Sequence, residues 1–416
     1  MTHILIWSIS AVSIALMLFR PFGVPEVVWT AAGALLLCLL RLIPLRLAGH
    51  AVAEGLDVYL FLSGMMLLSE LAKIHGVFDW LAAIAVKQGD GSPARLFTLI
   101  YGVGTVVTIF MSNDATAVVL TPAVLTAVKR AQVKPLPYLL ICALIANAAS
   151  FVLPISNPAN LVVFHSAMPP LFRWLKMFAL PSIASIGVTY LLLRWYCRNQ
   201  MATPSEEGEA VPQLSAPGKI SLFGILSVAV VLLVASALKM DLGFPTCLAS
   251  LVIAAIVLIR ERSNPMHIVR DVSWSVLPLV AALFVIVEAV KTAGALQLLN
   301  SALLHATQWP VALSALAVGG IVGLGTNLVN NLPLGLIAGA TLQTAPFHPI
   351  LAKAVLIGVD LGPNLSITGS LATILWLIAI RREGMHFSGW QFLKAGMIVM
   401  PISLLFTLGA ALVGAH

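Results

Sequence analysis

The chain has 416 residues, of which 60% are hydrophobic and 9% are charged. Soluble proteins carry about 25% charged residues, so this composition excludes a water-exposed globular protein and indicates an integral membrane protein. The net charge of +7 reflects 23 Lys and Arg against 16 Asp and Glu. In a protein with many membrane spans, such an excess of basic residues is typical of the cytoplasmic loops. We therefore expect no nucleic-acid partner, and we expect the protein to be surrounded mainly by membrane lipid.

The chain opens with an apolar run from Ile4 to Phe19 that has no basic segment before it and meets Arg20 behind it. A signal peptide has the opposite polarity, so this run predicts a first membrane span that stays in the protein. Further apolar runs follow, and at about 20 residues per crossing they predict roughly ten transmembrane helices.

One polar segment, residues 199–219, interrupts this series and contains three glutamates among prolines and glycines. We expect it to be a cytoplasmic linker between two membrane repeats, residues 1–198 and 220–416. Within each repeat some apolar runs are too short to cross a membrane alone. They predict one re-entrant hairpin and one broken helix per repeat, at about 93–128 and 138–169 in the first and at about 309–343 and 349–380 in the second.

Three markers occur in the same order in both halves. The motif ExxKxxG begins at Glu70 and again at Glu288, and we call the separation of these two glutamates the repeat offset. At nearly the same offset, the polar break Ser112-Asn113-Asp114 is matched by Asn330-Asn331, and the break at 154–160 is matched by 362–370. Paired, interrupted segments in two halves point to a transporter whose site is formed by discontinuous helices.

Five crossings in each half require the second repeat to lie upside down relative to the first. On this arrangement one side of the membrane holds 16 of the 23 basic residues and the other holds seven. The positive-inside rule makes the richer side cytoplasmic, so both termini are expected in the periplasm. The first hairpin then enters from the cytoplasm and the second from the periplasm. The seven basic residues of the periplasmic side are Arg41, Arg46, Arg173, Lys176, Lys239, Lys291 and Lys353.

Two acidic residues, Asp114 and Asp360, lie inside apolar stretches beside the breaks. A charge within the membrane is costly and by default indicates function. The alternative is a buried Asp that caps a half-helix, a role for which Ser, Thr or Asn suffices. Function is the favoured interpretation for both residues.

Amide and hydroxyl side chains are dense around the same breaks. Non-helical backbone in a membrane survives only when it is buried in protein or lines a water-filled cavity, so these side chains should face inward. There they would suit a small polar solute or an ion. About half of them are expected instead to satisfy the broken backbone. The candidate substrate-binding residues are Ser112, Asn113, Asn147, Asn157, Asn160, Thr326, Asn327, Asn330, Asn331, Asn364, Thr368 and Ser370.

Glu70 with Lys73, and Glu288 with Lys291, have i, i+3 spacing, which places each pair on one helix face. We expect them to form structural ion pairs or, alternatively, to relay the coupling ion. The four cysteines are widely separated and show no metal-ligand spacing, so neither a thiolate metal site nor a cofactor is expected.

The segments 323–333 and 358–374, together with 111–116 and 155–161, resemble the ArsB arsenite efflux permeases of the ion transporter superfamily. The resemblance covers most of the chain. It implies an all-α polytopic membrane protein with two inverted-topology repeats and paired re-entrant hairpins. The family has been pictured with twelve crossings, whereas the spacing here favours about ten transmembrane helices plus two hairpins and two broken helices.

The resemblance further implies export of arsenite or antimonite across the bacterial inner membrane in exchange for protons, sometimes with a cytosolic ATPase partner. Arsenite at neutral pH is an uncharged trihydroxide, which amides and one or two carboxylates can hold without a compensating cation. A neutral solute gains nothing from the membrane potential, so its uphill export requires a coupled ion. Because burial disfavours the charged form of a carboxyl group, the hypothesis that follows from the resemblance is that Asp114 or Asp360 exchanges its proton for substrate as the site changes access.

Other functions fit parts of the same pattern. A sodium/proton antiporter of the superfamily would coordinate its cation with the same Asn and Asp oxygens. A dicarboxylate or other anion transporter would need cationic donors, and no intramembrane Arg lies near the breaks. A non-transporting membrane subunit is disfavoured by the cost of the mirrored polar breaks. An enzyme is not expected, because the sequence has no pairing of nucleophile and base.

Overall fold

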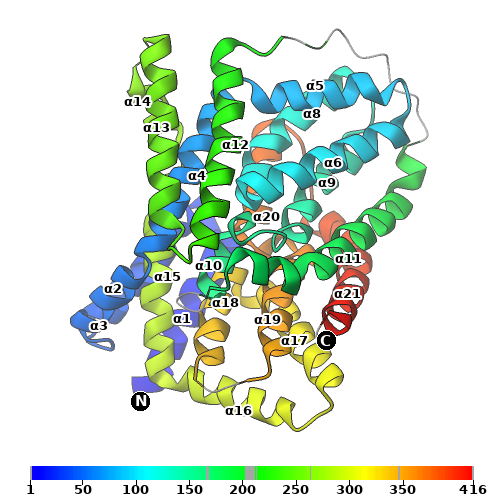
Figure 1. Cartoon of the computed structure of the whole chain (residues 1–416). Coiled ribbons are helices and arrows are strands. Elements are labelled where there is room, and N and C mark those ends of the chain that lie inside the picture. Colours follow the sequence, from blue (N-terminus) through cyan, green and yellow to red (C-terminus); the bar gives the residue numbers. More distant parts are fainter. Residues whose placement is uncertain are drawn as a thin grey trace.

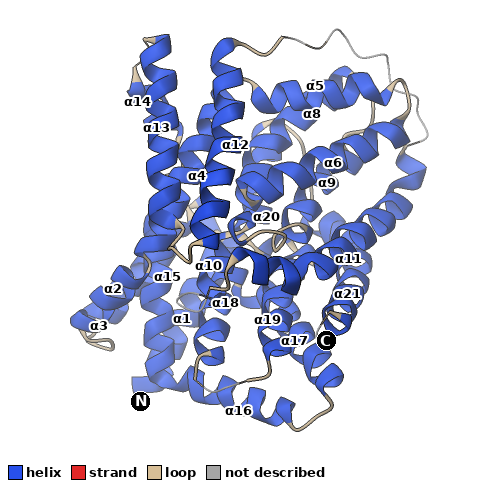
Figure 2. Cartoon of the chain, viewed as in Figure 1, coloured by secondary structure: helices blue, strands red, loops and turns tan. Residues whose placement is uncertain are grey.

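The computed structural model describes residues 2–164, 168–201, 211, 213–262, 264–344 and 347–414. Throughout these ranges the protein is helical and contains no strand (Figure 2). The all-α polytopic fold expected from the sequence is therefore confirmed.

The first half runs in the order expected, with a break inside the hairpin and another inside the helix that follows. Its helices are α1 (Thr2–Phe19), η1 (Pro21–Gly23), α2 (Glu26–Leu39), α3 (Leu45–Glu54), α4 (Leu56–Ile74), α5 (Val77–Gly89), α6 (Pro93–Met111), α7 (Asn113–Ala115), η2 (Thr116–Leu120), α8 (Thr121–Arg130), α9 (Leu136–Ala148), η3 (Pro154–Ser156), α10 (Pro158–Phe164), α11 (Leu171–Cys197) and η5 (Arg198–Gln200).

The second half repeats this order. Its helices are α12 (Ala216–Ala237), α13 (Gly243–Glu261), α14 (Pro265–Asp271), α15 (Val276–Val290), η6 (Lys291–Ala295), α16 (Leu296–Thr307), α17 (Val311–Val329), α18 (Asn331–Leu342), α19 (Pro349–Leu361), η7 (Gly362–Asn364), η8 (Ile367–Gly369), α20 (Leu371–Arg382) and α21 (Gly389–Val413).

Among the described residues, eight helices are long and apolar enough to cross a membrane, or nine if α3 and α4, which meet at a 45° bend, count as one span. Two of the eight, α6 and α17, are the first arms of the hairpins. The count differs from the ten expected because some crossings are short. Helix α2 has 14 residues, and the broken helices divide their length between α9 and α10 and between α19 and α20.

Each hairpin turns at a residue with a positive φ. Ser112 ends α6 with φ 96°, and Asn330 ends α17 with φ 77°. Both have extended ψ values, 161° and 153°, a combination that side chains other than Gly rarely adopt. Because the two residues are separated by the repeat offset, the same strained turn occurs at the same place in both repeats.

The two hairpins lie at opposite ends of the molecule (Figure 1). Helices α5, α6 and α8 lie towards the upper end in this view, and α16, α17 and α18 towards the lower end, while α10 and α20 lie between them. Helix α5 crosses the upper end as its counterpart α16 crosses the lower end. Opposed hairpins of this kind agree with the inverted arrangement expected from the sequence.

The segment expected to be the linker, residues 199–219, is shorter than the sequence indicated, and its residues 202–210 and 212 lie outside the described residues. Helix α12 begins at Ala216, before the expected end of the linker, and the Ser215 hydroxyl accepts a hydrogen bond from the Gly218 backbone N–H. Pro217 and Gly218, which suggested a linker, instead form the first turn of the helix, where Pro is well tolerated.

Backbones in the second repeat approach each other closely at glycines. A Cβ at Gly358 of α19 would lie 2.6 Å from the Gly319 carbonyl oxygen of α17, and a Cβ at Gly362 would overlap the Gly323 backbone. The glycines therefore let the hairpin arm and the broken helix pack with no side chains between them.

Candidate functional site

A small cavity of about 10 Å³ lies where the hairpin tips meet the broken helices. We call it the central cavity. Its volume is close to that of a single water-sized sphere. Its lining residues are Leu62, Asn113, Asp114, Asn157, Pro158, Val276, Val280, Asn331, Leu332, Leu371 and Ala372.

The lining of the central cavity is itself repeated. Leu62 and Val280 are separated by the repeat offset, as are Asn113 and Asn331. Pro158 of α10 is likewise equivalent to Leu371 of α20, at a slightly shorter separation. The cavity thus lies where the two repeats face each other, and each repeat contributes the same positions to it.

The polar groups of the central cavity come mainly from the hairpin tips. Asn113 and Asn331 are the first residues of α7 and α18, so they lie at helix N-termini, where free backbone N–H groups collect. Both side chains are buried, and neither Oδ1 atom has a hydrogen-bond partner among the described residues. Two buried oxygens without partners are costly unless a bound solute or water satisfies them.

Asp114 lies in the first turn of α7, beside Asn113, and lines the same cavity. A negative charge is favoured at a helix N-terminus by the helix dipole. At the repeat offset from Asp114, the equivalent position of the second repeat is Leu332, which also lines the cavity. Of these two equivalent positions, only that of the first repeat therefore supplies a carboxyl group to the cavity.

Asp360 is fully buried near the end of α19. Its Oδ1 atom accepts a hydrogen bond of 2.8 Å from the Asn157 side-chain amide, and its Oδ2 atom is buried without a partner among the described residues. Asp360 does not line the central cavity, but Asn157 does. The Asn157 amide thus connects this carboxyl group to the cavity.

Several of the other amides expected to bind substrate satisfy the backbone instead. The Asn160 side chain donates to the carbonyl oxygens of Ser150, Leu153 and Pro154, which it holds together at the break before α10. The Asn327 side chain donates to the Gly323 and Gly362 carbonyl oxygens. These two residues, with Thr326, Asn330 and Thr368, do not line the central cavity in this conformation.

Asn330 and the hydroxyl groups near it also hold the second hairpin to the second broken helix. The Asn330 amide donates to the Thr368 carbonyl oxygen, and the Thr368 hydroxyl donates to the Asn327 carbonyl oxygen. The Thr326 hydroxyl donates to the Gly323 carbonyl oxygen. Asn147, Asn364 and Ser370 bond to one another and to the Leu144 backbone. Eight of the twelve residues assigned to substrate from the sequence therefore have structural contacts.

A second cavity, of about 60 Å³, adjoins the central one and shares Leu62, Asp114 and Val276 with it. We call it the upper cavity, because part of its lining belongs to the first hairpin, which lies towards the upper end of the molecule in Figure 1. Glu70 and Ser112 lie in its wall, which is otherwise largely apolar. The remaining lining residues are Phe61, Met65, Met66, Ser69, Ala115, Val118, Val119, Val272, Ser273 and Leu375.

Both expected Glu–Lys pairs are present as ion pairs. The Lys73 Nζ atom lies 2.9 Å from Glu70 Oε1, and the Lys291 Nζ atom lies 2.9 Å from Glu288 Oε2. Neither pair lines the central cavity.

The sequence reasoning missed the apolar walls of the site. Leu62 on α4 and Val276 and Val280 on α15 belong to apolar runs that look like ordinary spans. The one sequence signal that could have identified two of these residues is the repeat, because Leu62 and Val280 precede the two ExxKxxG motifs by the same distance along the chain.

These features together define a class of protein. Opposed hairpins and broken helices enclose a small, amide-lined cavity within a bundle of apolar helices, which is the arrangement of a secondary membrane transporter. The protein is therefore a multi-pass membrane transporter.

The sequence matches the CitMHS family, described as citrate transporters, over residues 6–383. The chain belongs to this family. It is 26% identical to the arsenical pump membrane protein of Escherichia coli K12, over 84% of each chain. A Bacillus subtilis relative, provisionally named for the same activity, is 26% identical over 95% of this chain and 96% of its own. The resemblance to the ArsB permeases is thereby confirmed.

The fold is also similar to that of the YdaH transporter of Alcanivorax borkumensis. The two structures align with a TM-score of 0.56 over 88% of this chain and 86% of that one, at 14% sequence identity. This similarity supports the polytopic helical fold.

Proposed function

We propose that the protein exports trivalent arsenic and antimony from the cytoplasm, as the neutral trihydroxide, in exchange for protons. The observation that carries the proposal is the chemistry of the central cavity, in which Asn113, Asn157 and Asn331 surround one carboxyl group, that of Asp114. Amides both donate and accept hydrogen bonds, as a small trihydroxide requires. The names of the relatives agree with such a substrate.

The coupling proton is assigned to Asp114 or Asp360. Each lies in apolar surroundings where a permanent charge is costly, and each is connected to the central cavity, Asp114 directly and Asp360 through Asn157. The uncoordinated Asp360 Oδ2 atom suits a group that binds and releases a proton. A cytosolic ATPase is not required by this scheme, although one could supply additional energy.

The proposed orientation is based on the distribution of charge. We assign the upper end in Figure 1 to the cytoplasm of a bacterial inner membrane, because basic residues at the ends of α8 and α13, such as Arg130 and Arg260, belong to the side that holds 16 of the 23. Both marked termini lie towards the other end, which agrees with periplasmic termini.

Citrate, the substrate named for the family, fits the site less well. A tricarboxylate needs cationic donors, and the described lining of the central cavity contains Asp114 but no Lys, Arg or His. A sodium/proton antiporter is the second candidate, since the buried Asn113 and Asn331 oxygens would suit a hard cation.

Uptake of arsenite into everted membrane vesicles tests the proposal. We expect uptake when the vesicle lumen is made acidic and its loss when an ionophore collapses the pH gradient. Uptake without gradient dependence would overturn proton exchange. Sodium-driven proton movement without arsenite would favour the sodium antiporter, and gradient-driven uptake of citrate in place of arsenite would favour the anion transporter.

A further inference from the structure

A third cavity, of about 120 Å³, is lined mainly by residues of α3, α10, α15, η6 and α18. We call it the lower cavity, because α3 and α18 lie below α10 and α20 in the view of Figure 1. Its lining residues are Glu54, Val162, Phe284, Val287, Glu288, Lys291, Leu336, Ala340 and Gln343.

The upper and lower cavities are formed by equivalent positions of the two repeats. At the repeat offset, Glu70 in the upper cavity corresponds to Glu288 in the lower one, and Val118 corresponds to Leu336. Three further pairs of lining residues have the repeat offset, namely Met66 with Phe284, Ser69 with Val287, and Glu54 with Val272. A last pair, Val162 with Leu375, has the slightly shorter separation of Pro158 and Leu371. Six matched pairs show that one cavity is the inverted counterpart of the other.

Inverted counterparts on either side of one central site are what alternating access requires. Only the upper cavity shares lining residues with the central cavity; in the described lining of the lower cavity there is no residue in common with it. The central cavity therefore adjoins the upper cavity and shares no lining residue with the lower cavity in the part of the chain that the structure describes.

The chemistry of the two cavities differs although their positions match. The upper cavity has one acidic residue besides Asp114, namely Glu70, whose partner Lys73 lies outside the lining with a side chain 49% exposed. In the lower cavity Glu288 and Lys291 both line the wall, with side chains 19% and 20% exposed. Glu54 adds a second carboxylate at the position where the upper cavity has Val272.

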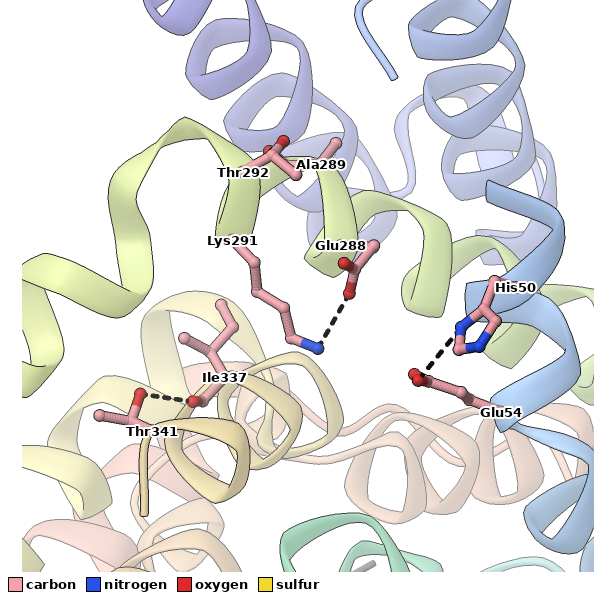
Figure 3. Close-up of polar contacts among 8 residues, drawn as sticks. All are labelled: His50, Glu54, Glu288, Ala289, Lys291, Thr292, Ile337 and Thr341. Atoms are coloured by element: carbon pink, nitrogen blue, oxygen red, sulfur yellow. Dashed lines mark hydrogen bonds and ion pairs between the residues drawn. The ribbon is translucent and has the colours of Figure 1, made fainter. Parts of the chain in front are cut away.

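Figure 3 shows these charged groups around a common space, into which Lys291 and Glu54 extend from opposite sides. The Lys291 Nζ atom lies 2.9 Å from Glu288 Oε2, and His50 Nδ1 lies 3.3 Å from Glu54 Oε1. Glu54 also lines a larger cavity of about 410 Å³ with Asp57, Lys239 and Asp241. The Glu54 carboxylate therefore lies between this wider polar space and the Glu288–Lys291 pair.

Other titratable groups on the helices packed against α15 and η6 lie outside the lining of the lower cavity, although His50 contacts its Glu54. Glu26 on α2 pairs with Arg20 at 3.1 Å, and among the described residues only Glu54 of these neighbouring helices joins Glu288 and Lys291 in the lower cavity. The titratable residues on α1 to α4 and α16, other than Glu54, are His3, Glu26, Cys38, Arg46, His50, Asp57, Tyr59, Glu70, Lys73 and His305.

We propose that the lower cavity is the point at which the coupling proton enters from the outside, with Glu54 and Glu288 as its proton-accepting residues. The proposal rests on the proton exchange proposed above. Glu54 takes a proton from water in the wider space, and Glu288 accepts one as it leaves its ion pair with Lys291. When the lower cavity opens to the central site, the proton passes to the site aspartate and Glu288 pairs with Lys291 again.

The proposal explains why the cavities differ. The upper cavity admits an uncharged trihydroxide, which needs no fixed charge along its path, and its walls are mostly apolar. The lower cavity collects a cation from dilute solution, and a cavity lined by carboxylates raises the local concentration of cations.

The experiment measures arsenite uptake into everted vesicles while the lumenal pH, on the lower side, and the external pH are varied separately. For Glu288→Gln and Glu54→Gln we expect a more acidic lumen to be needed for half-maximal uptake and an initial rate about tenfold lower at a small gradient, because positioned proton-transfer groups contribute about 10²–10⁴ to a rate. The concentration of external arsenite that gives half-maximal uptake should not change. Glu288→Asp should restore much of the rate.

Two matched controls remove other glutamates. Glu26→Gln removes an ion-paired Glu outside both cavities and should behave as the wild type does. Glu70→Gln removes the counterpart of Glu288 and should leave the lumenal pH dependence unchanged. The Glu54 variant provides the same test if Glu288→Gln fails to reach the membrane, because Glu54 is 39% exposed and is not needed for packing.

The outcomes separate the two proposals. Wild-type uptake that ignores the gradient would overturn the proposed proton exchange itself. Gradient-driven wild-type uptake with an unshifted lumenal pH dependence in both Glu54→Gln and Glu288→Gln would overturn only the role of the lower cavity. An equal shift in Glu70→Gln would do the same, because the effect would then belong to both cavities.

Discussion

The Asn147 side-chain amide donates a hydrogen bond of 3.0 Å to Asn364 Oδ1, across 217 residues of sequence. The two asparagines occupy equivalent positions, one at the end of α9 and one just after α19, so the repeats contact each other through the same residue. The Asn364 amide donates in turn to the Leu144 carbonyl oxygen, and the Ser370 hydroxyl donates to Asn147 Oδ1. A second pair of this kind joins Thr189 and Ser403, 214 residues apart.

From this contact we expect Asn147 to stabilise the fold rather than to bind the substrate. Asn147→Ala leaves the buried Asn364 Oδ1 atom without a donor, which costs about 1–3 kcal/mol. We expect a lower melting temperature of the purified protein in detergent, with arsenite affinity retained in the molecules that remain folded. The same melt with Asn300→Ala, a partly exposed amide that accepts a hydrogen bond from Thr344, provides the control.

A double-mutant cycle measures the contact itself. Asn147→Ala and Asn364→Ala should not be additive, since each removes the same interaction. Additive losses of stability would show that the two amides act separately.

Two substitutions at Asp360 should have different effects. Asn at this position has the shape of the protonated acid and keeps an acceptor for the Asn157 amide. We expect Asp360→Asn to change stability by no more than about 1 kcal/mol but to abolish uptake driven by a pH gradient. Asp360→Ala leaves the Asn157 donor unpaired and should lower stability by about 1–3 kcal/mol. Full gradient-driven uptake by Asp360→Asn would assign the proton to Asp114 alone.

Because α17 and α19 approach each other closely, adding one methyl group between them should strongly destabilise the protein. Gly358→Ala would place Cβ 2.6 Å from the Gly319 carbonyl oxygen, and such overpacking costs about 1–3 kcal/mol. Gly320→Ala, on the same pair of helices but with no atom within 4 Å of the new Cβ, should be neutral or slightly stabilising. Thermal unfolding of the two variants compares them directly, and equal melting temperatures would contradict the packing.

Replacing Ser112 by Gly should increase the stability of the protein but weaken arsenite binding. Its φ of 96° is strained for any residue with a side chain, so Ser112→Gly should raise stability by about 1 kcal/mol. The Ser112 residue lines the upper cavity beside Asp114, so loss of its hydroxyl should weaken arsenite binding severalfold, the effect of about one hydrogen bond. Ser112→Ala isolates the hydroxyl, because it should weaken binding equally with no gain in melting temperature.

Much of the fold could be predicted from the sequence because a membrane limits the choices of the chain. Interrupted apolar runs predicted both hairpins and both broken helices, with turns at Ser112 and Asn330, since only buried or cavity-lining backbone can leave a helix in lipid. The start of α12 was misplaced because Pro217 and Gly218 are as common in a first helical turn as in a loop.

The site could be predicted only in part. Asn113, Asp114, Asn157 and Asn331 were identified and line the central cavity, because amides and carboxylates are rare inside apolar sequence. Asn160 and Asn327 have the same composition signal but bind backbone carbonyl oxygens, and sequence cannot show which way an amide points. Glu54 was missed because the sequence does not show that it shares a cavity with Glu288, which is far away along the chain.

The glycine contacts also restrict how the protein can move. At Gly358 and Gly362 the backbones of the second hairpin and the second broken helix are in direct contact, so these segments have no layer of side chains over which to slide. Gly64 of α4 packs against the Thr246 and Cys247 backbone of α13 in a similar way. We therefore expect α17 with α19, and α4 with α13, to move as two stiff pairs, while α15 lines all three cavities. A crosslink between the two pairs should arrest transport, whereas one within either pair should leave it working.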